Sequence, residues 1–257
     1  MGGSPRAPAY PPSPSRARRL KLVLVMNKIL KIDVWSDIVC PWCAIGKRRL
    51  GAALSRFPHR DDVEVVWRAF ELDPSAPAVR EGDHATRIAE KYGRTKAQAE
   101  AMIQSVTDTA AKDGLHFELA RSRSGNTFDA HRVLQLAATR GLQDEVKERF
   151  FRGYMSEGQA IGEGEVLVRL ASEAGLATEE VRAVLESDRY AREVRAEEEA
   201  ARKLGIHGVP FFVFAGKYAV SGAQPADVIL RALEQAWTSL PEPVAQDGAA
   251  CGPEGCA

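Results

Sequence analysis

The sequence predicts an α/β fold in which a βαβ unit and a later segment of helix, hairpin and helix are separated by a large inserted helical domain. Three observations predict this arrangement. Before residue 73, two segments with alternating apolar and polar residues flank one amphipathic helix. From roughly 73 to 188, apolar residues recur at helical spacing. Extended structure returns near residue 209. At 257 residues, of which 45% are hydrophobic, the chain is long enough to bury a core without disulfides.

The N-terminal stretch, residues 1–28, is rich in Pro, Ser and Arg and poor in large apolar residues, so we expect a disordered extension. Basic residues precede an apolar run at 22–26, which is shorter than the core of a secretory signal and has no small-residue cleavage site after it. We therefore expect neither a signal peptide nor a membrane span, and hence a cytoplasmic protein.

Residues 29–72 form the first part of the predicted α/β domain. Apolar side chains alternate along 30–34 and again along 63–69, which is the period of a strand. Between the two strands, residues 43–57 carry Leu and Phe at the i, i+4, i+7 spacing of an amphipathic helix. A strand, helix and strand in this order predict a right-handed crossover between parallel strands.

Residues 73–188 form the predicted helical insertion, in which runs of β-branched residues are few. Asn126 with Asp129 resembles a capping box in front of a helix. Thr178 is expected to begin a long charged helix that ends near Gly205.

Residues 189–239 complete the predicted α/β domain. Apolar segments at 209–214 and 218–221, joined by a glycine-containing turn, predict a hairpin. The last helix is expected around 229–237, and the prolines that follow it mark 240–257 as a flexible tail.

Charge and cysteine content narrow the classes of function. The 35 basic and 35 acidic side chains give a formal net charge of zero, which predicts neither a nucleic acid nor an anionic membrane as partner. The four cysteines form two close pairs, Cys40 with Cys43 and Cys251 with Cys256. They are too few for a disulfide-rich secreted scaffold, so their clustering favours redox chemistry or a metal.

Cys40 and Cys43 have two residues between them and lie where the first predicted strand meets its helix. The free N–H groups and partial positive charge of a helix N-terminus stabilise a thiolate, lowering the pKa of the first cysteine from about 8.5 to roughly 3.5–7. Cys40 is therefore the predicted nucleophile and Cys43 the resolving thiol, with Pro41 and Trp42 setting the redox poise.

The proton of Cys43 needs an acceptor, and Asp33 and Asp37 are the candidates, although such carboxylates are more often simply solvated. Half of a zinc site, a structural disulfide or coincidence could also explain the pair. Zinc takes four ligands, and a zinc knuckle seldom has Pro-Trp inside it and an amphipathic helix directly after it. We therefore expect no metal and no cofactor.

Pro210 begins the apolar strand that follows Gly208 and Val209. Since proline has no N–H to donate, it fits the first residue of a strand or an edge. An ordinary trans proline and a cis Val209–Pro210 bond are both compatible with this position. A cis proline facing the dithiol would expose the Val209 N–H and C=O to an extended substrate segment.

Several motifs of this chain together resemble a known family: SDIVCPWC at 36–43 with Ile-Gly at 45–46, GVPFF at 208–212 and SGAQ at 221–224. They are similar to the FrnE-type proteins of the DsbA family of thiol–disulfide oxidoreductases, and the similarity spans about 31–237. The resemblance implies a thioredoxin-like fold with a large inserted helical domain, an attacking Cys40, a resolving Cys43 and a cis peptide bond before Pro210.

The segment NTFDAHR at 126–132 resembles a further motif of the family, on the inserted domain near the active-site groove. It implies a substrate contact for His131, and a plain place on a helix face explains His131 equally well. The family is related to 2-hydroxychromene-2-carboxylate isomerases and kappa-class glutathione transferases, which often carry a serine at the position of Cys40. Because this chain has both thiols, redox chemistry is favoured over isomerisation.

The second cysteine pair lies in the tail, where Cys251 and Cys256 flank Gly-Pro-Glu-Gly, a sequence that favours a turn. The resemblance implies an auxiliary dithiol that exchanges with Cys40 and Cys43. A disordered tail with an incidental disulfide, and a four-thiol metal site that unites both pairs, are the alternatives.

Taken together, these patterns predict a protein disulfide oxidoreductase or isomerase that forms mixed disulfides at Cys40. Protein or small-molecule thiols and disulfides are the expected partners, with glutathione as one candidate; Pro41, Trp42, Val209 and His131 are the expected substrate contacts. A glutathione-dependent isomerase or transferase acting on a small aromatic substrate is the first alternative. A non-catalytic binding protein is the second.

Overall fold

The computed structural model describes residues 28–241. The predicted N-terminal extension up to residue 27 and the tail from residue 242, with Cys251 and Cys256, lie outside the described residues. Within the described range, no helix is both long and apolar enough to cross a membrane.

A four-stranded mixed sheet contains the predicted strands. Its members are β1 (Leu30–Ser36), β2 (Val63–Ala69), β3 (Phe211–Phe214) and β4 (Tyr218–Ser221), in the order β2-β1-β3-β4. β1 and β2 are parallel, whereas β3 runs antiparallel to both β1 and β4. The predicted βαβ unit and the hairpin are therefore confirmed.

The helix between β1 and β2 is α1 (Pro41–Leu54), and it covers one face of the sheet together with α9 (Ala226–Ser239). Leu30, Ile32 and Val34 point to that face and are fully buried. The alternation of apolar residues along β1 thus places one side of the strand in the core, as the sequence predicts.

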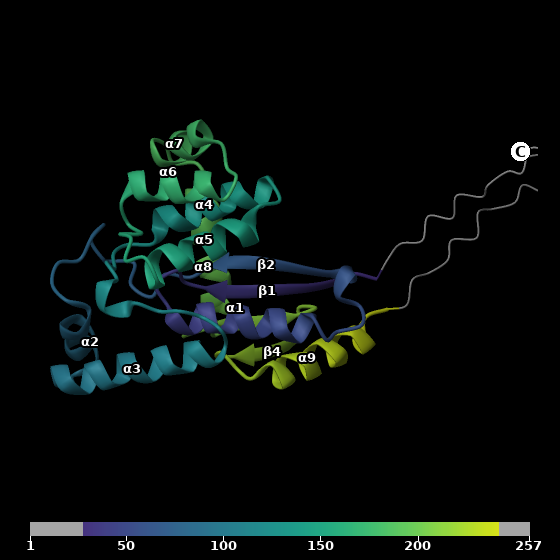
Figure 1. Ribbon diagram of the computed structural model, residues 1–257. Helices are drawn as coiled ribbons and strands as arrows, with labels where there is room; N and C mark the ends of the chain where they lie inside the picture. The colour runs from purple at the N-terminus through teal and green to yellow at the C-terminus, as the bar shows by residue number, and fades with distance from the viewer. Residues whose placement is uncertain (1–27, 242–257) are drawn as a thin grey trace, which may run out of the picture. The chain divides into compact units, whose positions relative to one another are not determined.

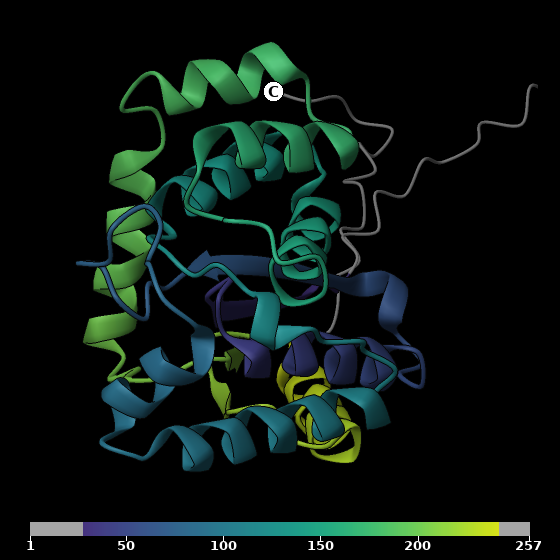
Figure 2. The same ribbon diagram turned by 60° about the vertical axis from the view of Figure 1, so that its left-hand side comes forward.

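The insertion between β2 and β3 is helical. It contains α2 (His84–Tyr92), α3 (Lys96–Lys112), α4 (Phe128–Thr139), α5 (Gln143–Met155), α6 (Gly164–Glu173), α7 (Thr178–Leu185) and α8 (Ala191–Lys203), and 3₁₀ turns lie at Arg60–Asp62 and Leu119–Arg121. Figure 1 shows α4 to α7 on one side of strands β1 and β2, with α1, α3 and α9 on the other. In Figure 2, α8 runs along one side of the molecule from these helices down to the level of the sheet.

The prediction of one long helix from Thr178 to Gly205 is wrong. The first helix ends at Leu185, and Tyr190 has a positive φ of 64° before α8 begins. The guanidinium of Arg132, on α4, donates to the carbonyl oxygens of Val184, Ser187 and Arg189 around this break. A buried cation from another helix thus satisfies carbonyls that would otherwise need a continuing helix.

The predicted capping box before α4 is also wrong. Thr127 is the N-cap residue, and the Asn126 side-chain oxygen accepts a hydrogen bond from the Phe128 N–H at 2.9 Å. Asp129 instead accepts from Arg132 at 2.8 Å. Asp129 is therefore drawn along the helix toward Arg132, and it does not return to the N-cap backbone as a capping box requires.

Helix α1 belongs to two hydrophobic clusters. Near its C-terminal end, Leu50 and Ala53 pack into the core beneath the sheet. Near its N-terminal end, Cys43 and Ile45 pack into a second core built mainly by the inserted helices. The dithiol therefore lies where the α/β domain meets the insertion.

Candidate active site

The dithiol occupies the start of α1, directly after β1. Cys40 is the N-cap residue, with extended backbone angles of φ −93° and ψ 112°, and Pro41 follows in the first turn, where a missing N–H costs no helical hydrogen bond. The Cys43 N–H donates to the Cys40 carbonyl oxygen at 3.0 Å. Cys40 is 5% exposed and Cys43 0%, whereas Trp42 between them is 44% exposed. Both cysteines are buried, and Cys40 is the more exposed of the two residues.

The surroundings move the pKa values of the two thiols in opposite directions. A hydrogen bond from the Cys43 thiol and the backbone N–H groups of Cys43 and Trp42 lower the pKa of Cys40, although burial and the charge of Asp37 act against them. Burial and the adjacent Cys40 sulfur raise the pKa of Cys43 well above its ordinary value. Cys40 is therefore the thiol that ionises first, which is what a nucleophile next to a protonated partner requires.

The loop before β3 faces this nucleophile. The Val209–Pro210 peptide bond is cis, as the resemblance implies. The Cys40 sulfur lies 3.6 Å from the Val209 carbonyl oxygen. Gly46 makes the approach of α1 to this loop possible, because a Cβ there would lie 2.9 Å from Pro210 Cγ.

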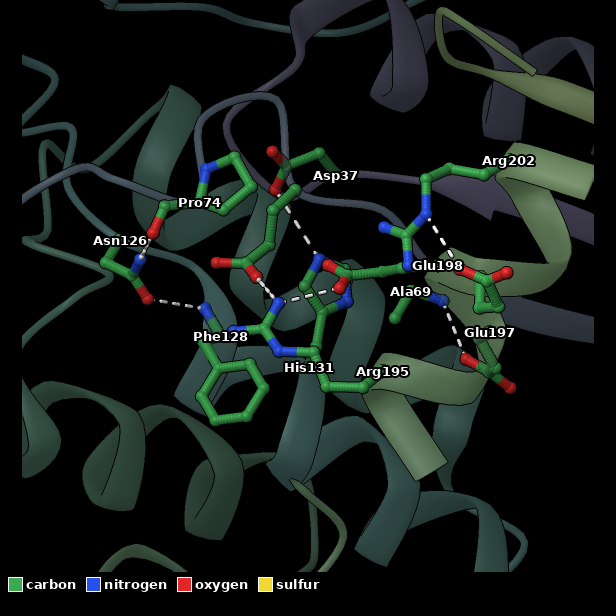
Figure 3. Close-up of polar contacts among 12 residues, drawn as sticks. Asp37, Ala69, Pro74, Asn126, Phe128, His131, Arg195, Glu197, Glu198 and Arg202 are labelled. Carbon is green, nitrogen blue, oxygen red and sulfur yellow. Dashed lines mark hydrogen bonds and ion pairs between the residues drawn. The ribbon is translucent and has the colours of Figure 1, made fainter. Parts of the chain in front are cut away.

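A buried acid–base pair lies behind Cys40. His131 Nε2, on α4, is 3.6 Å from Asp37 Oδ1, and both side chains are almost fully buried. Burial raises the pKa of Asp37, but the contact with His131 and a hydrogen bond from the Leu72 N–H outweigh burial and hold that pKa below its ordinary value. Figure 3 shows His131 pointing toward Asp37, inside the protein. The contact of His131 with substrate stays a prediction.

A second cluster of charged groups adjoins this pair. Arg195, on α8, is half-exposed and lies between the buried carboxylates of Glu71 and Glu198 at 2.5 and 2.6 Å. Its guanidinium lies 4.1 Å from the Phe128 ring centroid (Figure 3). Burial, partly offset by Arg195 and reinforced by Glu198, raises the pKa of Glu71 to about 7. This arrangement ties the loop after β2 to the insertion.

Lys147, on α5, is a site residue that the sequence analysis did not select. It is 0% exposed, and its Nζ donates to the Ser36 carbonyl oxygen at 3.2 Å. Burial lowers the pKa of Lys147 to about 8, and among the surrounding groups the Cys43 thiol opposes this lowering most. Lys147 lies at i−3 and i−4 from the buried Phe150 and Phe151, and a lysine on an apolar helix face is the sequence signal that could have identified it.

The predicted proton acceptors lie in different places. Asp33 accepts a 2.7 Å hydrogen bond from Arg68, which also pairs with Glu197 of α8, on the face of the sheet opposite α1. Asp37 lines a cavity of about 460 Å³ that opens next to Val39, the residue before Cys40.

Within residues 28–241, no three His, Cys, Asp or Glu side chains gather as a metal site would require.

Comparisons with known proteins agree with this geometry. Residues 31–234 match the model of the DSBA-like thioredoxin domain family. A crystal structure of a probable DsbA oxidoreductase from Streptomyces coelicolor is similar, with 46% identity and a TM-score of 0.80, covering 89% of this chain and 98% of the other.

Two further relatives are more distant. The uncharacterized protein YwbO of Bacillus subtilis is 31% identical over 206 residues, which cover 79% of this chain and 94% of the relative. A structure of 2-hydroxychromene-2-carboxylate isomerase has 15% identity and a TM-score of 0.57, covering 80% of this chain and 95% of the other. At that identity the likeness concerns the fold alone.

Proposed function

The chain belongs to the family of DSBA-like thioredoxin domains, and on this basis we propose that it catalyses thiol–disulfide exchange, with Cys40 as nucleophile and Cys43 as resolving thiol. The observation that carries the proposal is the pair of thiols at the first turn of α1, one with a lowered and one with a raised pKa. This asymmetry separates the attacking from the resolving role.

In the proposed reaction, the Cys40 thiolate attacks one sulfur of a substrate disulfide. A Cys40–substrate disulfide forms, and the other substrate sulfur leaves as a thiolate with the electron pair. Cys43 then loses its proton and attacks the Cys40 sulfur, which releases the second substrate thiolate and closes the Cys40–Cys43 disulfide. The dithiol is oxidised by two electrons and the substrate disulfide reduced by two, and the reverse sequence oxidises a substrate dithiol.

The proposed substrate contacts surround Cys40. Trp42 presents a half-exposed ring beside it, and the Val209 carbonyl oxygen faces its sulfur. An extended peptide, or the peptide-like backbone of glutathione, has the N–H groups that such a carbonyl accepts. Protein or small-molecule thiols and disulfides are the substrates that fit these contacts.

The experiment that tests this function is a pair of serine variants. Cys43→Ser should accumulate a covalent Cys40 adduct with a thiol substrate, visible by mass spectrometry, because the step that releases the adduct is removed. Cys40→Ser should form no adduct, and the unsubstituted protein should reduce or isomerise a model protein disulfide. A Cys43→Ser protein without an adduct, or an inactive unsubstituted protein, would contradict the proposal.

A glutathione-dependent isomerase or transferase is the second candidate, favoured by the fold it shares with 2-hydroxychromene-2-carboxylate isomerase. That activity requires glutathione and would survive Cys43→Ser, whereas disulfide exchange would not.

The auxiliary role of Cys251 and Cys256 is tested separately, by measuring the reduction potential of the dithiol in a glutathione buffer with both tail cysteines present and with both replaced by serine.

A further inference from the structure

Lys147 is buried in a way that a structural salt bridge does not explain. Its Nζ makes one hydrogen bond, to the Ser36 carbonyl oxygen, and lies 5.8 Å from the ring centroid of Trp67 and 5.2 Å from that of Phe151. Within residues 28–241, it forms no ion pair with a carboxylate. A lysine ammonium has three N–H donors and is rarely buried without a carboxylate partner. Charge pairing therefore does not explain the position of this amine.

Cys43 needs a proton acceptor inside the protein. Its thiol is 0% exposed, and burial raises its pKa well above the ordinary value, so bulk water is not in position to take the proton. When Cys43 attacks, the Cys40 sulfur is already bonded to substrate and is no longer a base. Asp33 is paired with Arg68 on the opposite face of the sheet.

Asp37 does not fit this role either. Its carboxylate accepts from the Leu72 N–H at 2.8 Å and faces His131, and these contacts hold its pKa below the ordinary value. A carboxylate of such low basicity is a poor match for a thiol whose pKa is raised. The positive charge of Lys147, in contrast, acts directly on Cys43 and lowers the pKa of that thiol.

The charges that face Lys147 come from three directions. Cys43 and Cys40 face it from the start of α1, Asp37 from the turn after β1, and Glu197 from α8. Burial lowers the pKa of Lys147 and these groups raise it, with a net value of about 8. About a tenth of the amine is therefore neutral at pH 7, enough to act as a base near neutral pH.

We propose that the neutral amine of Lys147 accepts the proton of Cys43 as Cys43 attacks the mixed disulfide at Cys40, and returns that proton when the dithiol is reduced. The inference rests on the proposed function. In this step the Cys43 S–H bond breaks and an N–H bond forms on Lys147, the Cys40–Cys43 bond forms, and the bond from Cys40 to substrate breaks. The substrate sulfur leaves with the electron pair, so no further oxidant is needed.

The insertion thus supplies an ionisable group that the sheet lacks on the face covered by α1. On the face covered by α1, strands β1 and β2 carry Ile32, Val34 and Trp67 toward the core, and none of these ionises in the accessible pH range. Lys147 reaches over Trp67 from α5 to the backbone of Ser36, at the end of β1. The inserted domain is therefore part of the thiol chemistry as well as a cover for the fold.

Single-turnover kinetics test the proposal. The reduced protein, with Cys251 and Cys256 replaced by serine, is mixed with an aromatic disulfide whose thiolate absorbs visible light. The first release of coloured thiolate reports attack by Cys40, and the second reports resolution by Cys43. In the otherwise unsubstituted protein, the rate of the second release should rise with pH through an inflection near 8, the pKa of Lys147.

Two variants and a matched control separate proton transfer from electrostatics. Lys147→Met removes the amine, and Lys147→Arg keeps a positive charge on a group that does not deprotonate. Lys147→Arg should leave the first release unchanged, whereas Lys147→Met should slow it slightly, because the charge of Lys147 also acts on Cys40. Both should slow the second release on the order of 100-fold at neutral pH. Lys47→Met is the control, because Lys47 lies at a similar 5.9 Å from the Trp67 ring but is paired with Asp144 and Glu148. It should change neither phase.

The outcomes distinguish the two proposals. Absence of the first release in the protein with Lys147 intact would overturn disulfide exchange itself, and this inference with it. A normal first release with a second phase that lacks the inflection near pH 8 would overturn the role of Lys147 alone, without any variant having to fold. A wild-type second phase in Lys147→Arg would also overturn proton acceptance, since charge would then be sufficient.

Discussion

Asp37 and His131 control the charge that Cys40 faces. The carboxylate of Asp37 raises the pKa of Cys40, and His131 lies 3.6 Å from that carboxylate. Asp37→Asn should therefore lower the pKa of Cys40, because a negative charge beside the thiolate is removed. His131→Asn should raise it, because Asp37 loses the neighbour that offsets its charge.

The ultraviolet absorbance of the Cys40 thiolate measures both effects when it is followed against pH in a background with Cys43, Cys251 and Cys256 replaced by serine. Each tenfold change in the thiolate ratio corresponds to about 1.4 kcal/mol. Opposite signs for the two variants are the specific expectation. Shifts of the same sign would show that the pair acts on the packing of α1 and not through its charges.

Residues with a local signature are the ones that the sequence identifies. Cys40, Cys43 and Val209–Pro210 stand out by spacing and by their position at element ends. The structure has the two cysteines at the start of α1 and a cis bond before Pro210. Lys147 is 104 residues from Cys43 in the chain. Its place on an apolar helix face indicates that it is buried, but the local sequence does not indicate that α5 packs on α1.

The break between α7 and α8 shows the same limit at the scale of elements. The charged residues from Thr178 onward favour a helix, and local propensity alone would continue it to Gly205. The chain ends the helix at Leu185 because Arg132, more than fifty residues earlier, binds the carbonyls exposed there. A contact with another helix thus overrides the helix propensity of these residues.

The loop between β2 and α2 packs against two glycines, and the absence of a side chain at each leaves room for the loop backbone. The Ala78 carbonyl oxygen lies so close to both that an added Cβ would be 1.8 Å away at Gly125 and 1.9 Å away at Gly162. The same loop is fixed by the Asn126 N–H, which donates to the Pro77 carbonyl oxygen at 2.8 Å. This loop lines the cavity beside the dithiol, so its position affects the active site.

Gly162→Ala should therefore destabilise the protein by about 1–3 kcal/mol, the usual range for forcing extra atoms into a packed site. Urea unfolding followed by circular dichroism measures the change. Gly51→Ala is the matched control, since Gly51 lies within α1 and has nothing within 4 Å of the added Cβ. Alanine there should stabilise by roughly 0.5–1 kcal/mol. Equal effects at the two positions would refute the role of close contact.

At the scale of the whole molecule, α1 joins two cores that the sequence describes as separate regions. Its C-terminal half packs beneath the sheet, and its N-terminal half, with the dithiol, packs among the inserted helices. The periodicity of each segment predicts the elements and their order but not this shared helix, because pairing between distant segments leaves no period in the sequence. Breaking either core should disturb the other, so residues 28–241 should unfold in one transition.

The redox state of the dithiol should change the stability of this single unit in a pH-dependent way. The folded pKa of Cys40 is lowered, so below the ordinary pKa of a cysteine, about 8.5–9, the unfolded chain binds more protons than the folded one. The stabilisation of the reduced form is therefore complete above about pH 9 and is lost as the pH falls through the folded pKa of Cys40. The raised pKa of Cys43 acts only above pH 9 and leaves this window unaffected.

Urea unfolding of reduced and oxidised protein across this pH range, with Cys251 and Cys256 replaced by serine, measures the difference. We expect the free energy of unfolding of the reduced form to fall with decreasing pH relative to that of the oxidised form, which has no thiol left to titrate at this site. Cys40→Ser cannot form the disulfide, and the pH dependence of its free energy of unfolding should follow that of the oxidised form. A difference between the two forms that is constant with pH would mean that Cys40 ionises alike in the folded and unfolded chains, and the nucleophile would then lack the stabilised thiolate on which disulfide exchange depends.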